Sequence, residues 1–326
     1  MTGPHPMHIA CTADAAYLPH CATMLVSLLD RHAHADVFVH FLHPADLAPG
    51  LREQLEAFVR DAGAQIQCHP LGDDCVRDLP SWPGLRPVMW YRVLLPRLLP
   101  ELERILYIDA DAVVLDDLWP LWRQPLGDAP LAAVTNVAPP SFAGHAQELG
   151  LPGAASYFNS GVMLLNLARL RDERAAERLV ELGRSRALRW WDQDALNIVF
   201  HEQRLALHPR WNCINGLFLF RAAEDLFGAT AVEEARRRPA IVHFEGPGPG
   251  KPWHYLNKHP YQSRYLHYRA RTPWPLRELE GATLHNRLLR LLPTKAILSV
   301  LSFEHRARQS WASLRSGRRE PKDAAA

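Results

Sequence analysis

The first 70 residues alternate between short apolar runs and longer segments in which apolar side chains recur at helical spacing. The apolar runs are short, continuous and rich in β-branched or aromatic residues, so they predict buried strands over 7–13, 36–42 and 65–69. Between them, apolar residues three or four positions apart predict helices over Leu18–His32 and Leu47–Ala62. This order, with short connections, predicts a parallel sheet covered by helices and joined by right-handed crossovers. Ligands of such a sheet gather at the carboxyl ends of its strands.

The residues after the first strand do not form a familiar phosphate-binding motif. No GxGxxG follows MHIACTA, and neither GxxxxGKS nor GxxxxGKT occurs, so a usual dinucleotide site and a P-loop are unsupported. Asp14 stands instead where the strand emerges. It is either a ligand contact or a cap of the turn or helix that follows.

An apolar run in the middle of the chain, YIDADAVVL (107–115), contains two acids. Asp109 and Asp111 stand two positions apart, and in a regular strand such residues point to the same side. Burying two neighbouring carboxylates is costly unless something compensates their charge. A hard divalent cation, which takes oxygen ligands, is the simplest compensation. The alternative is a strand end at which both acids face water or cap a turn.

Composition and charge narrow the class of protein. With 48% hydrophobic and 22% charged residues among 326, the chain is globular and long enough for one large α/β domain or two small ones. A net charge of +2 gives no field typical of a nucleic-acid binder. The five scattered cysteines include no CxxC pair, which favours a reducing compartment. The N-terminus lacks a signal-peptide pattern and no run approaches the roughly 20 apolar residues of a membrane span, so we expect a cytoplasmic protein.

The end of the chain is basic and amphipathic. From Leu284 onward it reads LHNRLLRLLPTKAILSVLSFEHRARQSWASLRSGRR, with many basic and large apolar residues and almost no acids. This pattern predicts one or two helices, interrupted by Pro293, that suit an anionic membrane surface. The alternative is a helix pair packed on the preceding domain with its basic face in water. We therefore expect a globular domain over 7–270 and a basic extension over 271–326, peripheral on the inner face of the cytoplasmic membrane.

Six blocks in the chain carry a family resemblance when they are taken together and in order. They are MHIACTAD, WYRVLLPRLLP, RILYIDADAVVLDDLWPLW, YFNSGVMLLNL, WWDQDALN and HFEGPGPGKPW, within roughly residues 7–260. The chain resembles the retaining glycosyltransferases of family 8, especially the bacterial lipopolysaccharide glycosyltransferases and, more distantly, glycogenin. The resemblance implies a GT-A fold, which is a single continuous α/β domain with a mixed, mostly parallel nucleotide-binding sheet flanked by helices. It also implies transfer of a hexose, galactose or glucose, from a UDP-sugar to a saccharide or lipid-linked glycan acceptor such as lipopolysaccharide.

The resemblance places a metal site at Asp109, Asp111 and His243, with Ala110 beside the donor. Mn²⁺ is expected, with Mg²⁺ as the alternative, because a neutral imidazole suits manganese better than it suits calcium.

The glycine-rich segment after His243 matches a loop that binds the donor diphosphate, with contacts from Gly246 and Lys251. Glycines let backbone N–H groups approach an anion, and Lys251 offers a point charge to phosphate. The family pattern is HxxGxxKPW, whereas this chain has HFEGPGPGKPW, which is about two residues longer. Whether Lys251 reaches the phosphate depends on how this loop folds.

Other residues of these blocks are implied to contact the donor. Asp14 matches an acid on the uracil or ribose side, with Thr12 and Ala13 as neighbouring contacts. Ala16 stands where the family has an asparagine. Arg92 is implied to face the donor, whereas arginines in general lie mostly at the surface.

Two further blocks are implied to lie at the transferred sugar. Asn159 and Ser160 offer groups for sugar hydroxyls, and Gly161 permits a close approach. Asp192 and Gln193 match residues beside the transferred sugar and are the catalytic candidates.

The segment around these catalytic candidates is predicted to open a helix. Acids at a helix N-terminus are favourable in themselves, and this is a sufficient explanation for Asp194. Trp190 and Trp191 are either core residues or an apolar platform for a sugar ring. Rival functions are a nucleotidyltransferase that makes a nucleotide-sugar, and a non-catalytic protein that binds carbohydrate or nucleotide.

Overall fold

The computed structural model describes residues 6–32, 36–81, 86–139, 142, 144–294, 296–297 and 299–301. Its larger sheet has seven strands within this part of the chain. In spatial order they are β3 (Gln65–Leu71), β2 (Val37–Pro44), β1 (Met7–Thr12), β4 (Arg104–Ile108), β7 (Phe158–Asn166), β6 (Leu131–Thr135) and β8 (Leu205–Ala206).

The larger sheet is mixed but mostly parallel. Strands β3, β2, β1 and β4 pair in parallel, whereas β7 pairs antiparallel with both of its neighbours. The predicted series of three strands and two helices is confirmed, with boundaries shifted by a few residues. The long helices of this series are α1 (Leu18–Leu29) and α2 (Pro49–Asp61).

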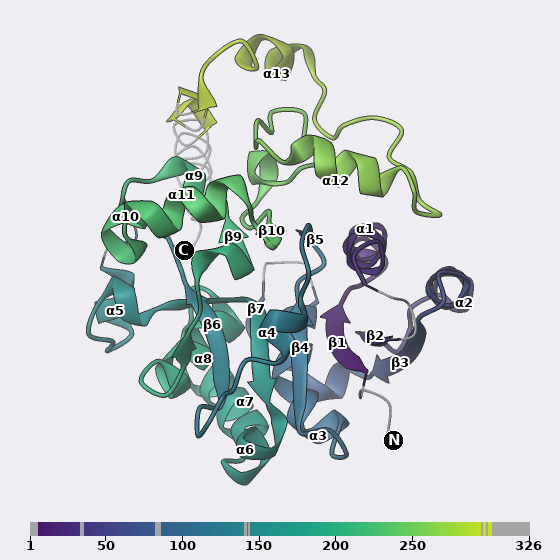
Figure 1. Ribbon diagram of the computed structural model, residues 1–326, viewed down its shortest axis with the longest axis vertical. Coiled ribbons are helices and arrows are strands. Elements are labelled where there is room, and N and C mark those ends of the chain that lie inside the picture. Colours follow the sequence, from purple (N-terminus) through teal and green to yellow (C-terminus); the bar gives the residue numbers. More distant parts are fainter. Residues whose placement is uncertain are drawn as a thin grey trace, which may run out of the picture.

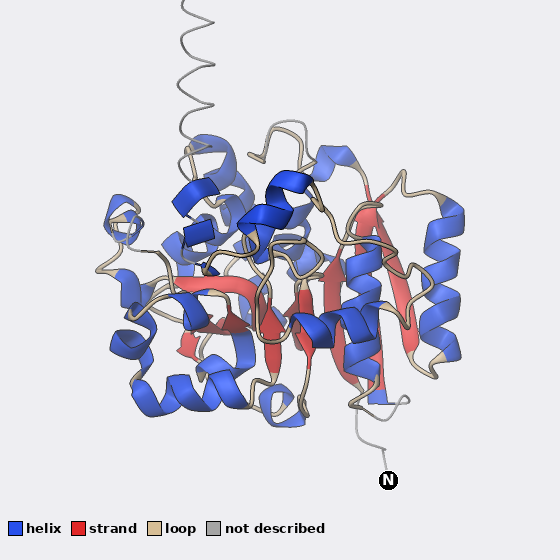
Figure 2. Cartoon of the chain, turned by 90° about the horizontal axis from the view of Figure 1, so that it is seen from above, coloured by secondary structure: helices blue, strands red, loops and turns tan. Residues whose placement is uncertain are grey.

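Helices cover both faces of this sheet (Figures 1 and 2). One apolar core joins α1, α2 and α4 (Trp119–Trp122) to one face. A second core joins the other face to the 3₁₀ helix η3 and to a set of α-helices. Helix η3 covers Val88–Leu94, and the α-helices are α3 (Leu95–Leu98), α6 (Leu167–Asp172), α7 (Ala175–Ser185) and α8 (Trp191–Phe200).

A smaller sheet lies beside the carboxyl end of β4. Its strand order is β5 (Ala112–Val114), β10 (Ile241–His243) and β9 (Cys213–Ile214). Figure 1 shows helices grouped around it. Further short elements come before the basic extension. They are η2 (Asp73–Cys75), α5 (His145–Glu148), η5 (Ala154–Ser156), η6 (Pro209–Asn212), α9 (Gly216–Leu219), α10 (Ala222–Phe227), α11 (Ala229–Arg237), η7 (Gly248–Gly250) and α12 (Gln262–Arg269).

The apolar pattern suggested that the acidic pair lies inside one strand. In the structure it lies between two strands. β4 ends at Ile108 and β5 begins at Ala112, so Asp109 and Asp111 lie in the connection between the two sheets. The chain leaves the large sheet at Asp109, because β4 pairs with β7 whereas β5 pairs with β10. This crossing places both acids at the edge where the sheets meet.

The described start of the basic extension holds α13 (Leu284–Leu289) and a further helical stretch after Pro293. Leu289 and Ile297 pack with Leu256, so this part contacts the preceding domain. Residues 302–326, which carry the rest of the predicted extension, lie outside the described residues. None of the helices described is both long enough and apolar enough to cross a bilayer.

Candidate active site

Backbone hydrogen bonds hold the acidic pair at the junction of the two sheets. The N–H of Asp109 donates to the carbonyl of Gly161 at 2.8 Å, and the N–H of Phe244 donates to the carbonyl of Asp111 at 3.0 Å. The Asp109 side chain is one-fifth exposed, and Asp111 is buried. Strands β7 and β10 therefore fix the backbone on both sides of the pair.

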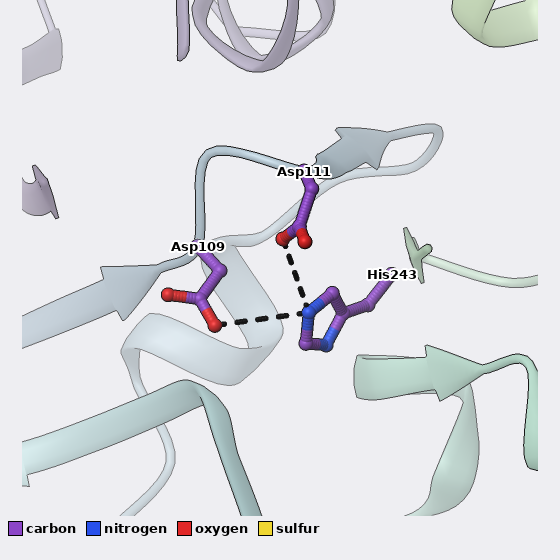
Figure 3. A group of neighbouring side chains, drawn as sticks. All are labelled: Asp109, Asp111 and His243. Atoms are coloured by element: carbon purple, nitrogen blue, oxygen red, sulfur yellow. Dashed lines mark ion pairs between the residues drawn. The ribbon is translucent and has the colours of Figure 1, made fainter. Parts of the chain in front are cut away.

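His243 completes a cluster with the two acids (Figure 3). Its Nε2 lies 3.2 Å from Asp111 Oδ1 and 3.7 Å from Asp109 Oδ2. One potential ligand atom from each residue lies within 4.8 Å of the others. Burial alone would lower the pKa of His243, but the two carboxylates outweigh it and raise the pKa.

A second layer of amides orients the imidazole. His243 Nδ1 lies 3.0 Å from Asn212 Oδ1, and Asn212 Nδ2 donates to Asn159 Oδ1 at 2.8 Å. Because the Asn212 oxygen faces the ring, Nδ1 carries a hydrogen, and Nε2 is the nitrogen that faces the acids. A donor set of two carboxylates and one imidazole with this outer support fits Mn²⁺ or Mg²⁺ binding.

Lys251 reaches the same cluster. Its ammonium group is buried and donates to Asp111 Oδ2 and, at 3.1 Å, to the carbonyl of Phe244. Burial would raise the pKa of Asp111, but Lys251 and His243 hold it well below its usual range. Asp111 is thus neutralised by two neighbouring cationic groups.

The longer glycine-rich loop folds back on itself. Residues Gly248–Gly250 form the short helix η7, and Gly246 has a left-handed φ of 82°. Asn257 Nδ2 donates to the carbonyls of Pro249 and Gly250 at 2.8 and 3.1 Å. The two extra residues are absorbed in this turn, so Lys251 still faces the acids.

Arg92 is a buried residue of the site and not a surface arginine. Its Nη2 lies 2.9 Å from Asp109 Oδ1, and its Nε lies 3.1 Å from Asp192 Oδ2. It stacks over the Tyr107 ring, whose hydroxyl donates to Asp109 Oδ1 at 2.8 Å. No pattern in the sequence indicates this role of Tyr107 or the role of Asn212.

Asp192 is a buried carboxylate with an unsatisfied oxygen. The single hydrogen on Arg92 Nε points to the carbonyl of Met89, so the 3.1 Å contact with Asp192 Oδ2 is an ion pair without a hydrogen bond. Burial raises the pKa of Asp192 from 3.8 to about 7, against the opposing effect of Arg92. The free oxygen can accept a hydrogen bond from a hydroxyl group.

Strand β7 and helix α8 bring the other sugar-side candidates together. The N–H of Ser160 donates to Gln193 Oε1 at 3.0 Å, and Arg92 Nη1 donates to the carbonyl of Ser160 at 2.9 Å. Gly161 also has a role within the protein itself. A Cβ atom there would lie 2.7 Å from both Asp109 Oδ2 and His243 Nδ1, so Gly161 makes room for the acidic cluster itself.

The residues at the end of β1 and just after it have local roles in the structure. Asp14 Oδ1 accepts a hydrogen bond from the N–H of Tyr17 at 2.9 Å, which is the turn-capping role considered above. Thr12 Oγ1 donates to the carbonyl of Leu42 at 3.1 Å, and Ala13 is buried. Ala110 is also buried and belongs to the first apolar core.

Comparison with known proteins identifies the family. Residues 8–257 match the model described as "Glycosyl transferase family 8". This chain belongs to glycosyl transferase family 8. Membership of this family makes the protein a glycosyltransferase. The resemblance to family 8 found in the sequence is confirmed.

Relatives and solved structures agree with this membership. General stress protein A of Bacillus subtilis (strain 168) is 30% identical over 82% of this chain and 94% of that protein. The lipopolysaccharide 1,2-glucosyltransferase of Escherichia coli (strain K12) is 24% identical over 82% of this chain and 79% of that protein. The crystal structure of the galactosyltransferase LgtC in complex with donor and acceptor sugar analogues matches with a TM-score of 0.72 and 24% identity, over 84% of this chain and 99% of that one. The family 8 chain therefore has the expected GT-A fold.

Proposed function

We propose that this family 8 protein is a metal-dependent, retaining hexosyltransferase that uses a UDP-sugar. The observation that carries the proposal is the convergence of Asp109, Asp111 and His243 beside the buried Arg92–Asp192 pair. The first group suits a divalent cation that binds the donor diphosphate, and the second suits the sugar. Galactose and glucose differ in one hydroxyl orientation, and both remain candidates for the sugar.

Charge develops in two places during glycosyl transfer. The leaving diphosphate becomes more negative, and Mn²⁺ or Mg²⁺ bound by the three ligands would stabilise that charge as a Lewis acid. Lys251, which donates to Asp111, is proposed to assist the leaving group. Asp192 and Gln193 would stabilise the positive charge on the sugar, and Asn159 and Ser160 are proposed to bind its hydroxyls.

The remaining donor contacts are proposed from the resemblance. They place the uracil or ribose near Asp14, Thr12 and Ala13, and the diphosphate near Ala110 and Gly246.

Retention of configuration calls for a covalent nucleophile or for attack by the acceptor on the same face of the sugar. A neutral amide such as Gln193 is a poor nucleophile, and Asp192 is paired with Arg92. We therefore favour same-face attack, with the diphosphate accepting the proton of the acceptor. Trapping a glycosyl adduct on Asp192 would overturn this choice.

The acceptor is proposed to be a saccharide or lipid-linked glycan of the cell surface, such as lipopolysaccharide. The name of the Escherichia coli relative supports this class of acceptor.

We further propose that the catalytic domain covers 7–270 and that the extension over 271–326 holds the protein on the inner face of the cytoplasmic membrane. Exposed leucines at 284, 288 and 291 support the membrane contact.

The test is a donor screen by mass spectrometry against a panel of nucleotide-sugars with Mn²⁺. We expect release of the nucleoside diphosphate from one UDP-hexose, and loss of that release in Asp109→Ala. Asp61→Ala, at the exposed end of α2, is the matched control and should keep full turnover. Release of pyrophosphate would indicate a nucleotidyltransferase, and binding without turnover would indicate a non-catalytic protein.

A further inference from the structure

The side-chain amide of Gln193 is fixed at both ends. Its Oε1 accepts from the N–H of Ser160 at 3.0 Å, and its Nε2 donates to the hydroxyl of Tyr157 at 3.0 Å. A backbone N–H can only donate, so the amide oxygen must face Ser160 and the NH₂ group must face Tyr157. The structure therefore allows one orientation of this amide.

Tyr157 is itself held by a buried carboxylate. Its hydroxyl donates to Asp194 Oδ1 at 2.6 Å, and His145 Nε2 lies 2.8 Å from the same oxygen. Burial and the Asp194 charge raise the pKa of Tyr157 well above its usual value, so the phenol keeps its proton. Tyr157 can then donate to Asp194 and accept from Gln193 at the same time.

Asp194 also orders the entry to α8. Its Oδ2 accepts from the N–H groups of Arg189 and Trp190 at 2.9 and 2.8 Å. The next residue, Trp191, has a φ of 39°, a strained left-handed value for a non-glycine residue. The simple favourable placement of an acid at a helix N-terminus, expected for Asp194, is therefore only part of its role.

Helix α8 is locked onto β7 one turn further along. Asn197 Oδ1 accepts from the N–H of Phe158 at 2.7 Å, and Asn197 Nδ2 donates to the carbonyl of Phe158 at 2.8 Å. The backbone of Gln193 is thereby set by Asn197, whereas its side chain is set by Tyr157 and Ser160. Loss of the Tyr157 hydroxyl would free the amide while leaving the helix in place.

We propose that Tyr157 is a positioning residue for the reaction, which fixes the side-chain amide of Gln193 and is itself held by Asp194 and His145. This inference rests on the proposed function, because it needs Gln193 to lie beside the transferred sugar. One amide hydrogen of Gln193 is used by Tyr157, and one lone pair of its oxygen is used by Ser160. The other amide hydrogen of Gln193 therefore has one fixed direction in which it can meet the sugar. A catalytic group that rotates away from its productive geometry loses rate more than it loses binding.

The test is a double-mutant cycle on donor turnover. Tyr157→Phe removes one oxygen atom and should lower kcat by about tenfold, the effect of one hydrogen bond, with the donor KM changed less than about threefold. In a Gln193→Ala background the same substitution should have no further effect on kcat. Two independent, multiplicative losses would overturn the proposal.

Two controls separate positioning from general loss of structure. Tyr261→Phe removes a hydroxyl that donates at 2.8 Å to the carbonyl of Arg236, outside this network, and should leave kcat unchanged. If Tyr157→Phe does not fold, His145→Ala acts on the same network from its far end. His145→Ala should lower kcat by a smaller factor in the wild-type background and should leave kcat unchanged in the Gln193→Ala background. A loss of kcat in both backgrounds would overturn the proposal.

The outcome is also distinguishable from failure of the proposed function. If wild-type protein turns over no nucleotide-sugar, the proposed function fails, and the cycle cannot be read from kcat. The orientation is then tested by a crystal structure of Tyr157→Phe. A Gln193 amide that keeps its wild-type position in that structure would overturn the positioning role on its own.

Discussion

At the scale of single residues, the site is a set of buried charges that neutralise one another. Arg92 contacts both Asp109 and Asp192, and Lys251 donates to Asp111. A buried carboxylate without such partners would be strongly destabilising. Lys251 therefore has two possible roles at one position, as the partner of Asp111 and as the proposed partner of the donor diphosphate. A cation that binds Asp111 must compete with it.

This competition predicts the effect of Lys251→Met on metal binding. Removing the ammonium frees Asp111 Oδ2, so the affinity of donor-free protein for Mn²⁺ should rise by about tenfold, the value of one charge-assisted hydrogen bond. Titration of Mn²⁺ by electron paramagnetic resonance or calorimetry measures this affinity without turnover. Lys258→Met is the matched control, because Lys258 is exposed and donates to the carbonyl of Leu292. Equal or weaker Mn²⁺ binding by Lys251→Met would contradict the competition.

Burial of Asp192 predicts a pH-dependent stability. Its pKa rises from 3.8 to about 7 on folding, so the folded state keeps a proton that the unfolded state releases between these values. The free energy of unfolding should therefore fall as pH rises through this interval, by at most about 1.4 kcal/mol per pH unit from this group. Asp192→Asn cannot ionise and should gain stability relative to wild type between pH 5 and pH 7. Denaturant unfolding at both pH values measures the difference, and a pH-independent difference would rule out the raised pKa.

At the scale of elements, the apolar pattern predicts strands well but does not show where one sheet ends. ILYI and AVVL around the acids read as one run, yet β4 and β5 pair with different strands. That change depends on β7 and β10, which lie about 50 and 130 residues further along the chain. Asn212 and Tyr157 were missed for the same reason, because their roles depend on distant partners and no local spacing marks them. His243 and Arg92 were found only through the family resemblance.

The packing of β7 against the acidic cluster predicts the effect of Gly161→Ala. A Cβ atom would overlap the His243 ring and lie 2.7 Å from Asp109 Oδ2, so the ring must move away from the acids. Displacing a proposed metal ligand in this way should reduce donor turnover by about 100-fold or more. It should also destabilise the fold by about 1–3 kcal/mol through overpacking. Mn²⁺-dependent turnover and thermal unfolding measure the two effects.

Gly50→Ala is the control for this substitution. Gly50 lies in α2, and a Cβ atom there would meet nothing within 4 Å. The change should leave turnover intact and stabilise the protein slightly, because alanine favours a helix. Normal Mn²⁺-dependent turnover by Gly161→Ala would show that the His243 position is not needed.

At the scale of the whole molecule, the described start of the extension has two different faces. Leu289 packs against the domain with Leu256, whereas Leu284, Leu288 and Leu291 are 77%, 63% and 81% exposed. The packing alternative is therefore met on one side of this segment, and the contact with a membrane stays a prediction for the open side. Exposed leucines next to Arg287 and Arg290 combine the apolar and basic character that suits an anionic bilayer surface.

This open face predicts that the protein binds anionic vesicles through its leucines. Replacing Leu284, Leu288 and Leu291 by serine should lower partitioning onto phosphatidylglycerol vesicles by about 100-fold or more, since insertion of each leucine stabilises binding by about 1 kcal/mol or more. The fold should keep its stability, because these side chains make little contact with the core. Vesicle co-sedimentation with thermal unfolding measures both, and neutral phosphatidylcholine vesicles control for the electrostatic part. Wild-type binding by the triple variant would show that the leucine face is not the contact. In that case a variant truncated after residue 301 would test whether residues 302–326 carry the binding instead.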